Sequence, residues 1–171
     1  MKSADALSVQ LDSAFLGKGW HGPTFLGSLR GISPAEALRK PDRCEHSLWH
    51  LLLHTTYWKY TILVRLGVAE SNSFPRSPSN WPTPPSASLM PALLAKQWKA
   101  DLALARETHA RLKRACNDIA DSQLDRIPAG GRSWTARQLI TGIAAHDVYH
   151  AGQSQLIKKM LRRSPRTKGP S

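Results

Sequence analysis

Apolar residues recur at helical spacing through most of this 171-residue chain, and this periodicity limits the folds open to it. In the first such segment, Leu7, Leu11 and Phe15 follow one another at steps of four. We find no run of alternating β-branched residues that would form a half-buried strand. The pattern predicts an all-α protein, whose long amphipathic helices we expect at residues 4–16, 44–66, 92–122 and 135–161.

Capping sequences indicate where two of the helices begin. Ser33 and Glu36 stand in the order of a capping box and predict a short helix ahead of the second long one. Thr135 and Gln138 form a second capping box at the start of the last helix. Four long helices with no sheet to cover favour an up-and-down four-helix bundle, which we expect to form one domain of residues 1–162.

Residues 71–88 contain five prolines and six serines. Neither a helix nor a central strand tolerates so many prolines, so this segment is predicted to be a long surface loop. Loops of this length in a compact domain often cover a functional pocket. Trp81, in the middle of the segment, either covers such a pocket or holds the loop against the surface.

The chain has 24 lysines and arginines against 12 acidic residues, a net charge of +12. Residues 158–171 contain six of the basic residues and no acidic one. We expect residues 163–171 to form a basic, disordered tail. Such a tail can attract nucleic acid or anionic lipid. No aromatic residue is interleaved with the charges to stack on bases, so we expect no specific nucleic-acid partner.

The remaining bulk features predict a cytoplasmic protein without a membrane span. No apolar run is long enough to cross a bilayer. Asp5, Gln10 and Asp12 interrupt any apolar stretch near the N-terminus, which therefore does not read as a secretory signal. Cys44 and Cys116 form no CxxC pair and no disulfide framework, so we expect two reduced thiols.

Five of the seven histidines lie at steps of four in two predicted helices: His46, His50 and His54 in the second, and His146 and His150 in the last. A step of four places two side chains one turn apart on the same face, where both imidazoles can reach one ion. Buried histidines with ordinary hydrogen bonds would also explain one such pair. A third histidine from a facing helix favours a metal site, but spacing does not choose among the three candidates in the second helix.

The residues around these histidines resemble the DinB superfamily of bacterial metal-binding four-helix proteins. Tyr57 and Trp58 follow His54 in the way that aromatics follow the single histidine of the family's second helix. The stretch HDVYHAGQ at residues 146–153 is similar to the last helix of the family, where an HxxxH pair runs into GQ. The resemblance covers roughly residues 4–162. It implies a DinB-like bundle with His54, His146 and His150 as the ligands of a divalent metal ion.

The resemblance also implies a range of functions. Members of the family bind zinc, nickel, manganese or related ions, and they often form dimers. Some are thiol-dependent transferases or isomerases that use low-molecular-weight thiols. Three imidazoles leave a coordination position open, which suits a metal-dependent thiol transferase or a hydrolase acting on a small-molecule substrate. The alternatives are a non-catalytic metal-binding or stress-related module, and a nucleic-acid or membrane-surface binder that uses the basic tail.

Three residues near the last two histidines are candidates for a catalytic or supporting role. Gln153 lies three residues after His150 and can orient a ligand or substrate by hydrogen bonding. Tyr149 either does the same or packs in the core. Asp147 is one residue, about 100°, around the helix from His146, so we expect it to point away from the ion, either as a surface acid or as a support for a ligand.

Two further groups of residues have structural interpretations. Gly142 and Gly152 each cost a helix about 1 kcal/mol relative to Ala, which close approach of a neighbouring helix or plain tolerance would explain. The aromatic residues of the second long helix are expected in the bundle core or at a dimer interface. Its aromatics are Trp49, Tyr57, Trp58 and Tyr60. His21 and His109 are expected not to bind metal.

Overall fold

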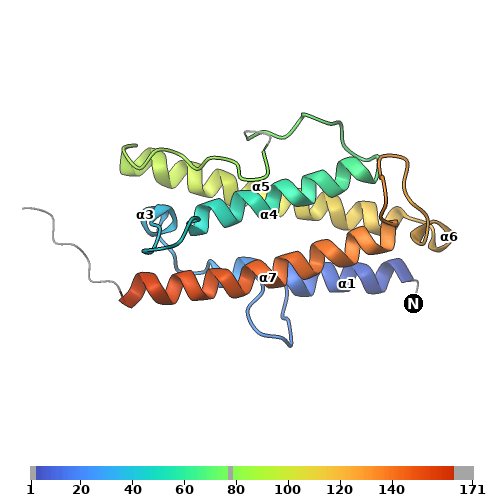
Figure 1. Cartoon of the computed structure of the whole chain (residues 1–171), viewed down its shortest axis with the longest axis horizontal. Helices are drawn as coiled ribbons and strands as arrows, with labels where there is room; N and C mark the ends of the chain where they lie inside the picture. Colours follow the sequence, from blue (N-terminus) through green and yellow to red (C-terminus); the bar gives the residue numbers. More distant parts are fainter. Residues whose placement is uncertain (1–2, 77–78, 164–171) are drawn as a thin grey trace, which may run out of the picture.

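The computed structural model of the protein describes residues 3–76 and 79–163, and it confirms the all-α fold class (Figure 1). In this part of the chain the regular elements are helices, apart from one isolated bridge between Gly19 and Gly22. The helices are α1 (Ser3–Phe15), α2 (Phe25–Ser28), α3 (Pro34–Leu38), α4 (Leu48–Arg65), α5 (Pro91–Asp118), α6 (Asp121–Leu124) and α7 (Ala136–Arg163). No helix in these ranges is long and apolar enough to cross a membrane.

The four long helices, α1, α4, α5 and α7, form the predicted four-helix bundle (Figure 1). Helices α1 and α4 each pack against both α5 and α7. Helices α1 and α7 run in one direction along the bundle, and α4 and α5 run in the other. Helices α4 and α5 are parallel, and the described segments between them, residues 66–76 and 79–90, lie along the bundle. The helix order is therefore up, down, down, up, and not a simple alternation.

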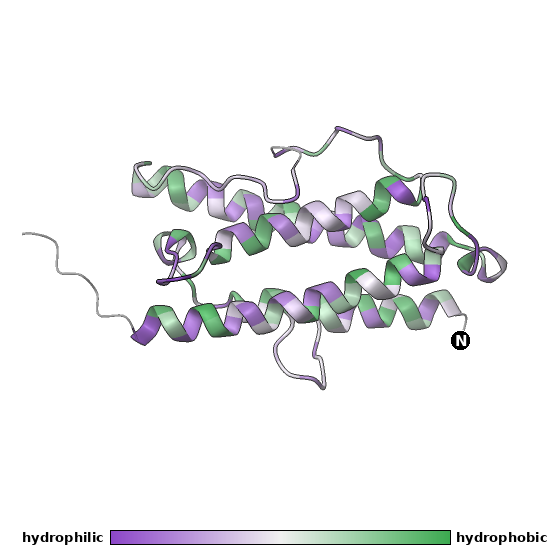
Figure 2. Cartoon of the chain, in the orientation of Figure 1, coloured by the Kyte–Doolittle hydropathy of each residue, from purple (hydrophilic) through white to green (hydrophobic). Residues whose placement is uncertain are grey.

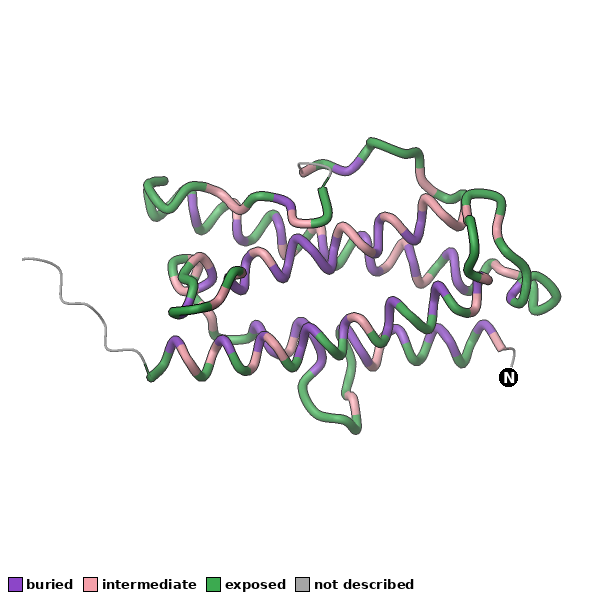
Figure 3. Tube along the Cα trace, viewed as in Figure 1, coloured by how far each residue is buried: buried purple, intermediate pink, exposed green. Residues whose placement is uncertain are grey.

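Two apolar clusters fill the bundle, one toward each end, and polar side chains lie between them. One cluster includes Phe15 and Trp49, and the other includes Ile62 and Leu112. Apolar residues line the inward side of the long helices, and buried positions follow the same faces (Figures 2 and 3). The middle turns of α4, α5 and α7 instead bury polar side chains. These include His54, Lys59, Asp101, His109, Asp147 and His150.

Helix α4 begins at Leu48, four residues later than the apolar pattern predicts, because Ser47 caps it. The Ser47 side chain accepts the backbone N–H of His50, and Nδ1 of His50 accepts the backbone N–H of Ser47 at 3.2 Å. This is a capping box in which histidine takes the place of the usual Glu or Gln. The prediction that His46 lies on this helix is wrong, because His46 precedes the cap.

The described part of the predicted loop 71–88 contains no helix or strand, and its first half is held against α4 and α5. The Tyr60 hydroxyl accepts the backbone N–H of Ser73 at 2.8 Å, and the Phe74 ring packs on Tyr60 with centroids 5.2 Å apart. Nε of Arg76 lies 3.6 Å from a carboxylate oxygen of Asp101. Further along the loop, Asn80 and Trp81 contact His54 of α4.

The boundary predicted at residue 162 falls at the end of α7, which extends to Arg163. Residues 164–171, most of the predicted basic tail, lie outside the described residues.

Candidate metal centre

His54 from α4 and His146 and His150 from α7 meet in the middle of the bundle. Nε2 of His146 lies 3.2 Å from Nε2 of His54 and 3.1 Å from Nε2 of His150. The candidate ligand atoms of the three residues all lie within 4.8 Å of one another. One ion can therefore reach all three nitrogens. The structure brings together the three histidines that the resemblance selects.

Hydrogen bonds behind two of the imidazoles determine which nitrogen carries the proton. Nδ1 of His54 lies 2.6 Å from the backbone carbonyl oxygen of Asn80, which can only accept, so Nδ1 donates. Nδ1 of His150 lies 2.7 Å from Oε1 of Gln153, whose amide nitrogen donates to the Tyr149 hydroxyl at 2.9 Å. In both histidines, therefore, Nε2 presents a lone pair toward His146.

Burial keeps the three imidazoles neutral at pH 7. The side chains of His54 and His150 are almost fully buried. Desolvation lowers the pKa of His54, and it lowers the pKa of His146 to about 3 and that of His150 to about 4. A neutral imidazole is the form that binds a metal ion.

The donor set fits a divalent cation. Nε2 of His146 faces the lone pairs of two other imidazole nitrogens and carries at most one proton to share between them. Its Nδ1 is buried and has no hydrogen-bond partner among the described residues. Without a cation, at least one of the two short N···N contacts sets two lone pairs against each other. A cation between the three nitrogens removes this repulsion, so the arrangement is what a metal-binding site requires.

The other two histidines of the series are used elsewhere. His50 belongs to the cap of α4, as described above. The His46 ring stacks on Trp81 with centroids 3.5 Å apart, and Trp81 also stacks on His54 at 3.8 Å. These contacts fit both interpretations of Trp81, because they hold the loop against the bundle and also place the ring over His54. His46 and His50 are not in the group of residues that could hold an ion.

The three supporting candidates are placed differently from one another. Gln153 accepts from His150 and so can fix the orientation of that ring. The expectation that Tyr149 packs in the core is wrong, because this residue is 62% exposed and accepts a hydrogen bond from Gln153. The alternative that Asp147 is a surface acid is also wrong, because its side chain is fully buried.

The carboxylate of Asp147 pairs with the Lys59 ammonium inside the bundle, and both side chains are 0% exposed. Nζ of Lys59 also lies 3.9 Å from the centroid of the Phe15 ring. Burial raises the pKa of Asp147 to about 6 and lowers the pKa of Lys59, while the charge of each partner acts in the opposite direction on the other. The carboxylate that follows His146 in the sequence is therefore engaged by Lys59.

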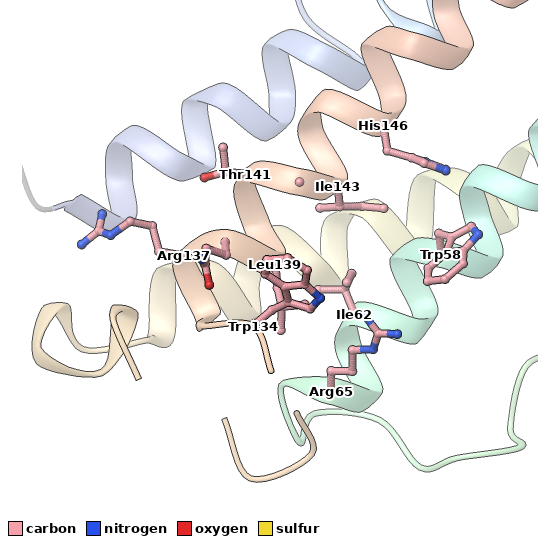
Figure 4. Close-up of a pocket in the computed structure, with 11 residues that line it drawn as sticks. Trp58, Ile62, Arg65, Trp134, Arg137, Leu139, Thr141, Ile143 and His146 are labelled. Atoms are coloured by element: carbon pink, nitrogen blue, oxygen red, sulfur yellow. The ribbon is translucent and has the colours of Figure 1, made fainter. Parts of the chain in front are cut away.

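An apolar cavity of about 550 Å³ opens beside His146, between α4 and α7 (Figure 4). Of the three histidines, His146 lines this cavity. The apolar walls come from both helices and from the segment before α7. They consist of Trp58, Ile62, Trp134, Leu139 and Ile143. A small molecule in the cavity would therefore lie directly against one of the candidate ligands.

Trp58 is half-buried and packs against the apolar cluster that includes Ile62, in line with the expected core position, and it also lines the cavity. Its ring centroid is 6.2 Å from that of His146. One expectation about this region is corrected. Close approach of a helix does not explain Gly142 or Gly152, because a Cβ at either position would meet nothing within 4 Å. Gly142 instead lines the cavity.

Sequence reasoning missed Asn80, Lys59 and Trp134. Asn80 acts on His54 through its backbone carbonyl, which no residue pattern reveals. The signal for Lys59 was a single basic residue on the buried face of an apolar helix. Trp134 lies just before α7, twelve residues from His146, and only the fold shows that both line one cavity.

The sequence model of the DinB superfamily matches residues 20–154, which include α4, α5 and all three histidines of the candidate site. No match was found among curated proteins, and none among solved structures.

Proposed function

The chain belongs to the DinB superfamily, and on this basis we propose that it is a metal-dependent enzyme acting on a small molecule, with His54, His146 and His150 as ligands. The observation that carries the proposal is the convergence of three neutral imidazole nitrogens beside an apolar cavity. Three protein ligands leave at least one position open for an exchangeable group, as in catalytic zinc sites. Closed structural sites use four protein ligands instead.

The choice of metal follows from the donor set. Imidazole suits zinc and nickel, whereas manganese prefers carboxylate and water oxygens. We therefore propose zinc or nickel ahead of manganese. The bound ion would supply Lewis acidity, which lowers the pKa of a thiol or a water molecule that reaches it. Gln153 and Asn80 hold two of the imidazoles in orientation, and Trp81 shields one face of His54.

Thiol transfer is the reaction that the surroundings favour. Hydrolysis gains from a general base, but no Asp or Glu is among the described residues that line the cavity, and Asp147 is paired with Lys59. A thiol of lowered pKa can lose its proton to solvent. We propose that a low-molecular-weight thiol is the co-substrate. Its sulfur forms a bond to an electrophilic carbon of the second substrate, and the leaving group departs with its electron pair.

A homodimer and a cytoplasmic location belong to the same proposal. Val148, Tyr149 and Leu156 are exposed apolar side chains on α7, which supports a second copy of the chain packing there. Cys44 and Cys116 are both free thiols, which is consistent with a reducing compartment. Light scattering of the purified protein would give its mass in solution.

Turnover in the presence and absence of metal tests the proposal. Thiol transfer would be followed as consumption of 1-chloro-2,4-dinitrobenzene by cysteine, and hydrolysis as release of 4-nitrophenol from 4-nitrophenyl acetate. We expect thiol transfer that a chelator abolishes, that Zn²⁺ or Ni²⁺ restores, and that His146→Ala removes. His21→Ala is the matched control, because His21 lies in the exposed loop after α1, and this variant should keep full activity.

Two results would favour one of the alternative functions over the proposed enzyme. A protein that holds its metal but turns over neither substrate would be a non-catalytic metal-binding module. Tight, salt-sensitive binding to DNA or to anionic vesicles, lost when residues 162–171 are deleted, would favour a role for the basic tail.

A further inference from the structure

The cavity beside His146 has basic residues at its edge as well as apolar walls. Arg65 and Arg137 line it, and no acidic residue is among its described lining residues. A second cavity of about 450 Å³ shares Arg65, Trp134 and Leu139 with the first and adds Arg132. It too has no acidic residue among the described residues that line it. The two adjoining cavities therefore combine an apolar interior with positive charge.

Of the two basic residues that line the first cavity, Arg65 is the one available to a ligand. The guanidinium of Arg137 is already bound to both carboxylate oxygens of Asp125, at 2.7 and 3.0 Å. Arg65 has no ion pair with a carboxylate in the described ranges 3–76 and 79–163, and it lies over the Trp58 ring, 5.6 Å from its centroid. Figure 4 shows its side chain beside Ile62, on the cavity side of α4.

We infer that this cavity binds a small organic anion with an apolar body. The body lies between Trp58 and Trp134, the anionic group pairs with Arg65, and the other end of the molecule lies against His146. This inference deepens the proposed function and rests on it, because it specifies the substrate of that same site. The volume is within the range of small-molecule sites, and a guanidinium matches the planar geometry of a carboxylate or the oxygens of a sulfonate.

Gly142 supplies part of the space for the ligand. It lines the cavity, and a Cβ built on it meets nothing within 4 Å, so a larger side chain at this position would occupy the cavity without disturbing the helix. Gly152 is an equally open position on the same helix, but it is outside the cavity lining. The chain thus offers a matched pair of substitutions, one that fills the cavity and one that does not.

Two fluorescent probes that differ only by a sulfonate test the inference. They are 8-anilinonaphthalene-1-sulfonate and its uncharged analogue N-phenyl-1-naphthylamine, titrated into the full chain with and without Zn²⁺. We expect the wild type to prefer the sulfonate by about tenfold, which corresponds to one charge-assisted hydrogen-bonded pair. Arg65→Gln should abolish this preference and leave the affinity for the uncharged probe unchanged. Arg106→Gln, an exposed arginine of α5, should behave as the wild type.

Filling the cavity separates binding inside it from binding to the basic surface. Gly142→Leu should weaken binding of both probes at least tenfold, whereas Gly152→Leu should bind both as the wild type does. An unchanged preference in Arg65→Gln would overturn the inference, and so would wild-type binding in a folded Gly142→Leu variant.

The readout also separates this inference from the proposed function. A protein without turnover that still binds the sulfonate through Arg65 would contradict the enzyme and keep the anion site. A metal-dependent enzyme whose binding does not depend on Arg65 would contradict only the anion site.

Discussion

The imidazole of His150 has one nitrogen facing the other two histidines and the other against Gln153. Such a hydrogen bond behind a ligand fixes the tautomer and the ring orientation, and its loss usually lowers metal affinity by 10- to 100-fold. We therefore expect Gln153→Ala to weaken zinc binding about tenfold, measured by competition with a coloured zinc chelator. Tyr149→Phe should have a smaller effect, since Tyr149 acts only through Gln153. Equal affinities for Gln153→Ala and the control Gln155→Ala would contradict this role.

The buried pair of Lys59 and Asp147 makes a different prediction, which concerns stability. Removing one partner leaves an uncompensated charge in the bundle interior, whereas replacing both with apolar residues of similar volume does not. Lys59→Met should therefore lower the free energy of unfolding by about 3–5 kcal/mol in urea titrations. The double variant Lys59→Met/Asp147→Leu should recover most of that loss. A single variant as stable as the wild type would show that the pair is not held as described.

At the residue scale, sequence reasoning identified some ligands better than others. Spacing placed His146 and His150 one turn apart on one helix face, where both can reach one ion, but it did not exclude buried histidines with ordinary hydrogen bonds. Spacing could not choose His54, and the family resemblance did so. His46 and His50 are not ligands for a physical reason: the imidazole of His50 takes part in the cap of α4, and His46 lies before the first residue of the helix. Capping boxes are normally recognised by Glu or Gln at the third helical position, so this one was not apparent.

Among the elements, α4 begins at a capping box, whose effect on stability can be measured separately from metal binding at His54. Ser47→Ala removes the side chain that accepts the N–H of His50, and we expect a loss of about 1 kcal/mol in the free energy of unfolding. Ser133→Ala, at an exposed loop position, should change it by less than about 0.5 kcal/mol. Because His54 is almost two turns from the cap, metal content should not change. Loss of metal with unchanged stability would contradict this account.

The segment between α4 and α5 shows what a sequence pattern leaves open. Its prolines predicted a loop, and the described part is one. They did not predict that α4 and α5 would be parallel, because an 18-residue helix is about 27 Å long and a loop of this length can either turn back at once or span the bundle. Nor did they predict that the Asn80 carbonyl would accept from His54. Contacts of that kind depend on the fold and not on local sequence.

For the whole molecule, the buried histidines make stability depend on pH. Burial lowers the pKa of His109 and His150 to about 4 and that of His146 to about 3. In the unfolded chain these groups take up protons near pH 6.5, so acid favours unfolding. Asp147 opposes this trend, because its raised pKa of about 6 makes the folded state the better proton acceptor. The three histidines together change the free energy of unfolding by more than the one carboxyl group does. This free energy should therefore fall as the pH decreases from about 7 to about 4.

Urea titrations of metal-free protein at several pH values would measure this dependence. His109 alone, which is 1% exposed, would contribute on the order of 3 kcal/mol across the full range. His109 also contacts Asp12 at 3.0 Å and stacks on Phe15, so its burial is not tied to the metal site. Stability that is constant or rises on acidification would show that these imidazoles are not buried in the neutral form.

The bundle as a whole was predictable because four long apolar stripes have few other ways to be covered. Its polar middle was not, since Lys59, His109 and Asp147 lie on faces that periodicity assigns to the core. That middle layer separates two apolar clusters and contains the candidate metal centre. The fold therefore follows from the apolar pattern, whereas the site depends on where that pattern is interrupted.

The central claim is that one divalent ion is held by His54, His146 and His150. Elemental mass spectrometry of untagged wild-type protein and of the His54→Ala, His146→Ala and His150→Ala variants tests it most directly, with His46→Ala as the neighbouring control. We predict close to one zinc or nickel ion per chain in the wild type and in His46→Ala, and a large loss in each of the other three variants that still folds. A wild type that contains no metal, and takes none up from Zn²⁺, Ni²⁺ or Mn²⁺, would contradict the account.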